Sequence, residues 1–559
     1  MTNLKVLTTR AMLDNSAELY PENVALSYVG EKALTYRDVH SKCKSLSLLL
    51  AKKGIKKGDK VALIGPNMPN WGVAYLTITS MGAIVVPILT DFSGFEIQKI
   101  LRHSQSDALI ISEKSASLVK GNVPERIHTS ISLENLSEIN VVALNESGDT
   151  LHFESESHLM LDNVSVSEPE EKDLAAILYT SGTTGSPKGV MLSHLNIISN
   201  AVNTLKIQDV NENDRLLSVL PLSHTYECTI GFIIPFMKGA AVYYIDKPPT
   251  ASVLLPAMAM VRPTMMLTVP LIIEKVYKLQ VLPKLSGSLI LRNLSKFSPL
   301  KKLFHKLAGK KIYKAFGGKL HFFGIGGAKL NAEVERFLRD ANFPYAIGYG
   351  LTETSPLLAG CSPSLTKFQS TGFNLPGQQV KILNPDPKTG EGEIVAKGPN
   401  IMQGYYKEPE KTAEVFTEDG WFKTGDLGNI DKDGYIYIRG RLKNMIIGPS
   451  GENIYPEDIE EVINSQSFVL ESLVYELKGK LVAKVHLNYE ELEQRYQHLK
   501  DSAHQWRDSI KEISAQKLTE IKEQVNANIN KFSRINIIME QPTPFEKTPT
   551  KKIKRYMYQ

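Results

Sequence analysis

The sequence predicts an α/β protein: a large N-terminal domain of α/β subdomains plus a small β-rich unit, followed by a smaller α+β C-terminal domain. A chain of 559 residues is too long for one hydrophobic core, since cores stop growing near roughly 250–300 residues. Short apolar runs alternate with amphipathic stretches in the first part, which is typical of a largely parallel sheet. After Phe368 the pattern changes to short strands and turns, and we place the domains at 1–440 and 441–559.

The first domain begins with three apolar runs that read as central strands, at 61–66, 83–89 and 108–112. The stretch between Lys60 and Asp91 holds no charged residue and is long enough to cross a bilayer. Prolines and glycines divide it into short pieces, however, and the pieces predict one buried strand–helix–strand unit. We expect an irregular segment over 115–166 and a second α/β pattern over 174–358.

The later part of the chain has a different pattern of apolar and turn-forming residues. Short strands separated by turns, at 378–383, 392–398 and 434–440, predict the small β-rich unit. In the second domain we expect a polar loop at 448–453 and strands near 473–477 and 481–487. The charged stretch 490–530 has apolar residues at helical spacing, which predicts a long surface helix or a helical pair.

Cysteine usage and the two ends of the chain bear on the compartment. Cys43, Cys228 and Cys361 are far apart and form no CxxC pair, so we expect reduced thiols and no structural zinc. The first residues lack the charged leader and apolar core of a signal peptide, and the last residues carry no lipidation or peroxisomal signal. We therefore expect a cytoplasmic protein.

The strongest motif is YTSGTTGSPKG at 179–189, directly after the apolar run 174–178. Small hydroxyl residues and glycines after a strand form a loop whose amides and hydroxyls can surround phosphate oxygens, and Lys188 can add a mobile cation. It is not a Walker loop, because no GK[ST] closes the required spacing. An ordinary glycine-rich turn is the alternative, and the eleven matching positions count against it.

Six further motifs occur in order along the chain. They are LPLSHTYE at 220–227, GIGGAKL at 324–330, YGLTETSP at 349–356, GWFKTGDLG at 420–428, GRLKNMIIGPSGENIYPEDIE at 440–460 and TPTKKIKR at 548–555. Together with the loop they resemble the adenylate-forming (AMP-binding) superfamily, which includes acyl-CoA synthetases, adenylation domains and luciferases. The resemblance covers nearly the whole chain and implies ATP and Mg²⁺ as cofactors, an acyl-adenylate intermediate and a thiol acceptor.

The resemblance assigns nucleotide-binding roles to residues of the loop and of the later motifs. They are Thr180, Ser181, Gly182, Thr183, Thr184, Gly185, Lys188, Gly327, Ala328, Tyr349, Gly350, Asp426 and Arg441. Asp426 would accept hydrogen bonds from both ribose hydroxyls, as an acceptor-only carboxylate can, with Arg441 as the second ribose contact. Glu353 would bind Mg²⁺ together with Thr184, since a metal on a triphosphate needs only one or two protein carboxylates, and Thr352 would contact phosphate.

Three residues near the C-terminal domain match family positions with other roles. Lys443 matches the hinge between the domains, which implies that the C-terminal domain is mobile. Gly451 matches the glycine that lets the pantetheine arm pass close to the backbone. Lys552 matches the lysine that enters the site during adenylation, where it would offset charge in the transition state, although Lys551 stands where the family has glycine. Taken alone, the sequence favours a solvated lysine at position 443, and a simple basic tail is the alternative for Lys552.

The motif around His224 bears on the acid. His224 and Glu227 form an HxxE spacing that resembles long-chain fatty acyl-CoA synthetases, and His224 would lie near the bound carboxylate. The similar segment 262–277 is apolar enough to line a tunnel for an alkyl chain, although a buried helix and strand fit its composition equally well. We therefore expect a ligase that activates a long-chain fatty acid to acyl-AMP, with Lys552, His224, Thr352 and Glu353 as catalytic residues.

Two alternatives remain open at this point. The acceptor thiol is expected to be coenzyme A, and the phosphopantetheine of an acyl carrier protein is the first alternative. A non-catalytic acyl- or nucleotide-binding protein is the alternative of a different class. It predicts that polar residues of the motifs are replaced, and none of the matched polar positions is.

Positive charge is concentrated at 275–332, a window with thirteen basic residues and no Asp or Glu. Against a net charge of +5 for the chain, these charges leave the other residues at −8. The stretch 300–316 predicts a helix with a cationic face, suited to peripheral contact with an anionic membrane, to an acidic carrier protein or to the phosphates of coenzyme A. A plain solvated surface is the simplest alternative, and no motif points to nucleic acid.

Overall fold

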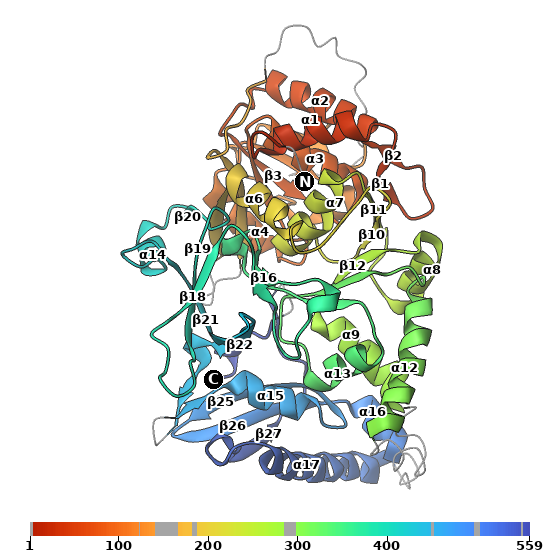
Figure 1. The fold of residues 1–559 in the computed structure, drawn as a ribbon, viewed down its shortest axis with the longest axis vertical. Coiled ribbons are helices and arrows are strands. Elements are labelled where there is room, and N and C mark those ends of the chain that lie inside the picture. Colours follow the sequence, from red (N-terminus) through yellow and green to blue (C-terminus); the bar gives the residue numbers. More distant parts are fainter. Residues whose placement is uncertain are drawn as a thin grey trace. The chain divides into compact units, whose positions relative to one another are not determined.

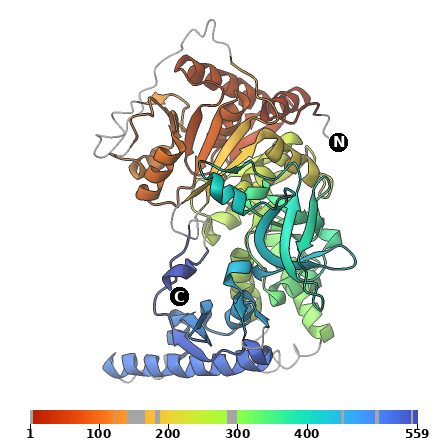
Figure 2. The same ribbon diagram turned by 90° about the vertical axis from the view of Figure 1, so that its left-hand side faces the viewer.

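The computed structural model describes residues 4–121, 123–139, 166–180, 187–283, 298–448, 452–496, 503–548 and 552–559. Its contacts divide the chain into two compact units, shown as ribbons in Figures 1 and 2. Unit 1 comprises Met1–Lys381, Ala396–Phe422 and Asp431–Ile436, and unit 2 comprises Ile382–Val395, Lys423–Ile430 and Tyr437–Gln559. The domain boundary at 440/441 and the mobility of the second domain stay predictions. None of the helices described is long and apolar enough to span a membrane.

Unit 1 holds two large sheets, as the apolar runs predict. The strands of the first are β3 Lys60–Ile64, β4 Ile84–Ile88, β5 Ala108–Ile111, β6 Thr129–Ser132, β7 Glu138–Ile139, β8 Leu174–Thr180, β9 Lys188–Ser193 and β20 Gly404–Tyr405. They lie in the order β20-β9-β8-β4-β3-β5-β6-β7, and β8, β4, β3, β5 and β6 are parallel. The hairpin β8–β9 is antiparallel.

The second sheet of unit 1 is also mainly parallel. Its strands are β1 Val24–Tyr28, β2 Leu34–Thr35, β10 Arg215–Ser218, β11 Ala241–Tyr244, β12 Met265–Thr268, β13 Phe322–Ile325 and β14 Tyr345–Ile347, in the order β14-β13-β12-β10-β11-β1-β2. Neighbours from β14 to β1 pair in parallel. The carboxyl ends of β10, β12, β13 and β14 therefore share one edge, where ligands usually bind in such sheets.

Helices cover both faces of these sheets. They are α1 Thr9–Leu19, α2 Tyr36–Lys52, α3 Pro69–Ser80, α4 Gly94–Ser104, α6 His194–Thr204, η2 Tyr226–Ile233, α7 Ile234–Met237, α8 Ala251–Val261, α9 Pro270–Val276, η3 Tyr277–Val281, α12 Ser298–Ala315, α13 Ala332–Asp340 and α14 Pro409–Glu414. The strand–helix–strand prediction for the uncharged stretch is confirmed, because β3 and β4 pair in parallel and every residue of α3 from Trp71 to Ser80 is buried.

A small antiparallel sheet completes the part of unit 1 that concerns the site. It consists of β15 Tyr349–Gly350, β16 Leu357–Gly360 and β17 Phe373–Asn374, and the short helix η4 Thr352–Thr354 lies between the first two strands. Because β15 follows β14 after one residue, this sheet starts at the carboxyl edge of the seven-stranded sheet.

The predicted β-rich unit is a four-stranded sheet with the order β18-β19-β21-β22. Its strands are β18 Gln379–Leu383, β19 Gly392–Lys397, β21 Phe422–Ile430 and β22 Ile436–Arg441. In unit 2 there follow η6 Leu442–Asn444, β23 Ile446–Ile447, β24 Asn453–Ile454, α15 Pro456–Asn464, β25 Val469–Leu477, β26 Lys480–Leu487, α16 Tyr489–Tyr496, α17 Ala503–Asn528 and β27 Ile537–Glu540. The helical structure predicted over 490–530 is confirmed for the residues that α16 and α17 cover, while the choice between one helix and a pair falls on 497–502, outside the described residues.

The sheet β25-β26-β27 forms the core of the C-terminal segment. Apolar residues of α15 and α17 pack on one face, around Val474 and Val485. Phe545, Ile553 and Tyr558 from the end of the chain pack on the other face. This last segment therefore has a fixed place within unit 2.

Candidate active site

Three predicted site segments follow parallel strands of the seven-stranded sheet. The turn with His224 comes after β10, the turn with Gly327 after β13, and the turn with Glu353 after β14 and β15. The first two turns touch, since a Cβ built on Gly326 would lie 3.1 Å from Cζ of Tyr226. The shared carboxyl edge thus brings together motifs that span residues 224 to 353 of the sequence.

The turn from Tyr349 to Ser355 is held by buried side-chain amides. Asn200 on α6 donates from Nδ2 to the carbonyl of Leu357 at 2.8 Å, and Asn400 donates from Nδ2 to the carbonyl of Thr354 at 2.9 Å. Helix α6 begins directly after β9 with a capping box between Ser193 and Asn196, which fixes where Asn200 points. The turn is therefore preorganised by contacts from two distant segments.

Gly350 has a steric reason to be glycine. A Cβ at this position would lie 1.9 Å from the carbonyl oxygen of Pro356, because β15 and β16 approach each other closely there. Tyr349 beside it is half-buried, and Gly350 is exposed. The close pairing of the two strands thus requires glycine at position 350, and the adenine contact of Tyr349 and Gly350 stays a prediction.

Glu353 lies in a group of three side chains from distant segments. The hydroxyl of Tyr405 donates to Oε1 of Glu353 at 3.0 Å, and Nζ of Lys188 lies 4.8 Å from the centre of the Tyr405 ring. Tyr405 reaches this position because β20 pairs with β9, opposite Val190. Sequence reasoning missed Tyr405, since the motif search gave no signal at that position.

The structure describes only the two ends of the predicted phosphate-binding loop, and phosphate binding stays a prediction. Thr180 and Lys188 are paired across the hairpin β8–β9, so these two ends lie side by side. The predicted contacts Ser181, Gly182, Thr183, Thr184 and Gly185 lie outside the described residues. Lys188 is half-buried and lies on the same side of the hairpin as Tyr405, which places a cation near Glu353.

The donor set at Glu353 fits a magnesium ion that is bound mainly by phosphate. In the part of the chain that the structure describes, no three His, Cys, Asp or Glu side chains form a metal cluster. Glu353 is half-buried and Tyr405 anchors one of its oxygens, so it supplies a single oriented carboxylate. Mg²⁺ in such sites takes most of its ligands from phosphate and water. Thr352 begins η4 beside this carboxylate.

Gly327 and Ala328 form an open turn after β13. Gly327 has a φ of +87°, which favours glycine, and a Cβ built there would meet only Val269 Cγ1, at 3.6 Å. Both residues are exposed. Their backbone groups are therefore accessible to a ligand at the carboxyl edge.

The hydrogen bonding of His224 indicates its tautomer. The backbone N–H of Tyr226 donates to Nδ1 of His224 at 3.2 Å. A ring nitrogen that accepts a hydrogen bond carries no proton, so a neutral His224 holds its proton on Nε2. The role of His224 beside the bound carboxylate stays a prediction.

Glu227, the other residue of the HxxE spacing, is completely buried in the π-helical turn η2. Neither carboxyl oxygen has a well-formed hydrogen bond within the described residues. Burial raises its pKa to about 8, with a smaller lowering by the Ser218 hydroxyl. Gly231 makes room for this side chain, since a Cβ there would lie 2.8 Å from its carboxyl carbon. Glu227 is therefore held as a neutral acid at neutral pH.

We expect Glu227→Gln to flatten the pH dependence of stability. The pKa of Glu227 rises from 4.5 to about 8 on folding, so the folded state binds more protons than the unfolded state between these values. The contribution of Glu227 to the free energy of unfolding is complete below pH 4.5. It declines by about 1.4 kcal/mol per pH unit as the pH rises from there towards 8. Melting temperatures from pH 5 to 8 should fall more steeply for the wild type than for Glu227→Gln.

The matched control for this experiment is Glu414→Gln, because Glu414 is exposed. It should keep the wild-type slope of melting temperature against pH. Equal slopes for the wild type and Glu227→Gln would show that Glu227 does not titrate in this way.

An apolar pocket lies within unit 1 beside these segments. It is lined by Thr204, Ile207, Gln208, Tyr226, Ile230, Leu267, Phe322, Gly324, Ile325, Ala346, Ile347, Gly348, Leu357, Gly360 and Cys361. Tyr226 belongs to the turn of His224, and Gly348 directly precedes Tyr349. The pocket therefore adjoins both the predicted carboxylate contact and the predicted adenine contact. Leu267 is the residue that the predicted tunnel segment 262–277 contributes.

The predicted ribose contacts lie in unit 2 and bind each other. Nε of Arg441 lies 2.9 Å from Oδ1 of Asp426, and Nη1 of Arg441 donates to the carbonyl of Thr424 at 3.2 Å. Asp426 is buried on β21, while Arg441 is half-buried at the end of β22. The pair thus forms a fixed acidic and basic group on adjacent strands, and its binding of ribose stays a prediction.

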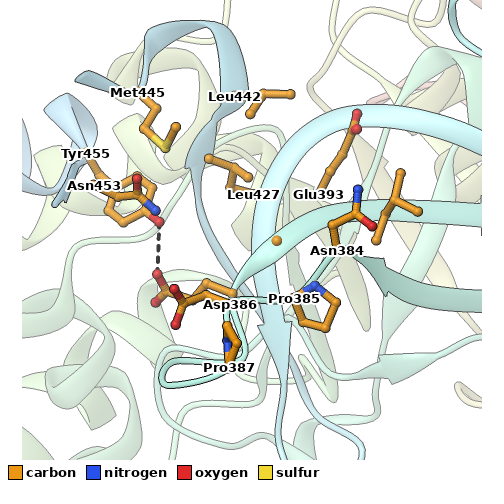
Figure 3. Close-up of a pocket in the computed structure, with 13 residues that line it drawn as sticks. Asn384, Pro385, Asp386, Pro387, Glu393, Leu427, Leu442, Met445, Asn453 and Tyr455 are labelled. Atoms are coloured by element: carbon orange, nitrogen blue, oxygen red, sulfur yellow. Dashed lines mark hydrogen bonds between the residues drawn. The ribbon is translucent and has the colours of Figure 1, made fainter. Parts of the chain in front are cut away.

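A pocket in unit 2 adjoins this pair (Figure 3). Leu427 and Leu442, which follow Asp426 and Arg441 in the chain, both line it. At its other side the hydroxyl of Tyr455 donates to Oε2 of Glu391 at 2.8 Å, marked by the dashed line. Its lining combines apolar side chains with carboxylates that are already bonded to protein groups.

Of the three remaining predicted residues of unit 2, the structure describes Lys443 and Lys552. Lys443 is exposed within η6, and Gly451 lies outside the described residues. Lys552 is exposed on a turn in which its N–H donates to Oγ1 of Thr548 at 3.1 Å, and Thr548 N–H donates to its carbonyl at 2.7 Å. The backbone of Lys552 is therefore fixed, and its side chain reaches solvent.

Known proteins that resemble this chain include a family of enzymes and several ligases. The profile of the AMP-binding enzyme family matches residues 13–406. A long-chain-fatty-acid–CoA ligase of Bacillus subtilis is 29% identical, covering 84% of this chain and 82% of its own length. A chloroplastic long-chain-fatty-acid–[acyl-carrier-protein] ligase of Arabidopsis thaliana is 28% identical, covering 82% and 73% respectively.

A solved structure with the same fold is O-succinylbenzoate coenzyme A synthetase of Bacillus subtilis in complex with ATP and magnesium ion. It superposes with a TM-score of 0.73 at 23% identity and covers 98% of both chains. At this level of identity the likeness concerns the fold, and it confirms the α/β fold class that the sequence predicts.

Proposed function

The chain belongs to the AMP-binding enzyme family of adenylate-forming ligases, and we propose that it activates a long-chain fatty acid and transfers the acyl group to coenzyme A. The observation that carries the fatty acid is the small apolar pocket lined by Tyr226 and Gly348, which would have to widen to admit a long alkyl chain. An acid bound with its carboxylate at His224 Nε2 would direct its alkyl chain into this pocket. The long-chain ligases among the relatives support the same substrate class.

In the first step, a carboxylate oxygen of the acid attacks the α-phosphorus of ATP. A P–O bond to the acyl group forms, the bond to the leaving phosphate breaks, and acyl-AMP and pyrophosphate result. His224 orients the carboxylate, while Lys188 and the loop that it closes bind phosphate oxygens. Glu353 would hold Mg²⁺, which supplies charge neutralisation on the phosphates when bound, and Asp426 with Arg441 would fix the ribose.

In the second step, the thiol sulfur attacks the acyl carbonyl carbon, and the bond to AMP breaks. The protein supplies no nucleophile of its own, so its contribution is positioning and charge stabilisation. Lys443 would serve as the hinge about which the C-terminal domain rotates between the steps, and Gly451 would leave space for the pantetheine arm. Lys552 would act in the first step only.

The acceptor has a second candidate, the phosphopantetheine of an acyl carrier protein. The specific observation in its favour is the relative from Arabidopsis thaliana, whose name gives the carrier protein as acceptor. The chemistry of both steps is the same for either thiol.

AMP release from ATP, measured across acids of increasing chain length with each acceptor, tests the proposal. We expect turnover to peak at a long-chain acid with coenzyme A. Turnover with carrier protein alone would identify the carrier protein, and not coenzyme A, as the acceptor. A peak at a short or aromatic acid would refute the fatty acid assignment. Absence of acid-dependent turnover would favour the non-catalytic alternative.

We expect Gly348→Val to shift the chain-length preference towards short acids. A Cβ on Gly348 would lie 3.0 Å from Leu357 Cδ1, so a valine side chain must extend into the pocket. Overpacking of this kind costs about 1–3 kcal/mol, which predicts a loss of kcat/KM for a long-chain acid of roughly 5- to 150-fold. Turnover of a short acid by the same variant is the internal control. Equal losses for long and short acids would remove this pocket as the acyl site.

A further inference from the structure

Helix α12 is packed into unit 1 along one face only. His305, Gly309, Ile312 and Phe316 are buried at helical spacing on this face. Nδ1 of His305 lies 2.8 Å from Oδ2 of Asp340, and a Cβ on Gly309 would lie 2.3 Å from Cβ of Ala341 at the end of α13. Figure 1 shows α12 beside α13, with its other long side away from that helix.

The opposite face of α12 carries leucines. Leu300, Leu303 and Leu307 are 36%, 52% and 60% exposed. Their spacing of three and four residues places them in one stripe along the first turns of the helix. A single exposed leucine is ordinary on a soluble protein, but an aligned stripe on the solvent side indicates a contact surface.

Lysines lie on both sides of this stripe and continue towards the buried face at Lys302. All five are exposed, and none forms an ion pair with any part of the chain that the structure describes: Lys302, Lys306, Lys310, Lys311 and Lys314. The sequence of α12 contains no acidic residue. Three further basic residues of the window 275–332 precede α12 and lie outside the described residues: Lys284, Arg292 and Lys296. The solvent face of α12 is therefore both apolar and strongly cationic.

We propose that the solvent face of α12 binds peripherally to an anionic phospholipid surface. The three leucines would enter the boundary between headgroups and acyl chains, and the five lysines would contact lipid phosphates. An apolar stripe bordered by cations matches a surface in which an apolar layer lies directly beneath an anionic one. An acidic carrier protein would account for the lysines and leave the leucine stripe unexplained.

This inference goes beyond the proposed ligase activity and does not depend on it. A surface-bound enzyme would be close to fatty acids, which partition into membranes, but adenylation itself needs no membrane. Lipid binding and ligase activity can therefore fail separately, and each has its own measurement.

Cosedimentation of the full chain with vesicles tests the proposal. The wild type should bind phosphatidylglycerol-containing vesicles, with affinity falling as salt rises, and should bind pure phosphatidylcholine vesicles much more weakly. The variant K302Q/K306Q/K310Q/K311Q should lose on the order of 100- to 1,000-fold in affinity, since each of four lysines near an anionic surface contributes roughly fivefold. The variant L303S/L307S should lose roughly fivefold through its apolar contribution alone.

Matched controls come from exposed residues elsewhere in unit 1 and unit 2. Leu19 and Leu365 are 59% and 52% exposed, so L19S/L365S removes the same amount of exposed leucine. K32Q/K44Q/K388Q/K478Q removes four exposed lysines of other segments. Both controls should bind vesicles as the wild type does.

Three outcomes would overturn the proposal. The wild type could fail to bind anionic vesicles, or the control variants could lose as much affinity as the α12 variants. The third outcome is that the lysine variant binds vesicles normally and loses acyl transfer to an acidic carrier protein, which would assign this face to the carrier.

Discussion

Lys552→Ala should reduce acid-dependent exchange of pyrophosphate into ATP by on the order of 100- to 1,000-fold, the usual cost of removing one preorganised group that stabilises transition-state charge. Thioester formation from added acyl-AMP should stay near the wild-type rate, because Lys552 is assigned to the first step only. The two half-reactions are measured separately, so that one variant reports on both.

The structure offers a matched control for this experiment in the same short segment. Lys547 and Ile553 form an isolated bridge, and the packing of Ile553 and Tyr558 on the sheet of unit 2 holds the segment in place. Lys554→Ala removes a neighbouring cation from this segment and should leave both half-reactions nearly unchanged. Equal loss of both half-reactions in Lys552→Ala would assign this lysine a structural role.

The fold was predictable because its signals are local. The uncharged stretch between Lys60 and Asp91 is interrupted by prolines, which excluded a membrane span and predicted β3, α3 and β4. Strand runs in the β-rich unit and the helical structure of unit 2 were likewise visible as periodicity. The site motifs were recognisable since each follows a strand and depends on a few adjacent residues.

Features that depend on pairing between distant segments were not predictable. Tyr405 contacts Glu353 only because β20 pairs with β9, and no property of its neighbours in sequence indicates this. The complete burial of the Glu227 carboxyl depends on how η2 packs. The sequence predicted a cationic helix at 300–316, but which leucines face solvent was decided by the contact of α12 with α13.

Glu353→Gln should reduce the rate of pyrophosphate exchange and raise the Mg²⁺ concentration that gives half the maximal rate. The fold reduction in rate should be at least as large as the fold increase in that concentration. The amide keeps the shape of the side chain and can still accept the hydrogen bond from Tyr405 through Oε1, so the turn that Asn200 and Asn400 hold should stay folded. What the substitution removes is one negative charge, which a hard cation needs from its oxygen ligand. Exchange rates measured against Mg²⁺ concentration would show the effect.

Tyr405→Phe separates the charge of Glu353 from its orientation. This variant keeps the carboxylate and deletes the hydroxyl that donates to it at 3.0 Å. Loss of such an outer contact typically costs about 10- to 100-fold in metal affinity or activity. The Mg²⁺ requirement should therefore increase from wild type to Tyr405→Phe and again to Glu353→Gln. An unchanged requirement in Glu353→Gln would mean that another group holds the metal, whereas an unchanged requirement in Tyr405→Phe alone would mean that the backbone of η4 orients Glu353 without help from β20.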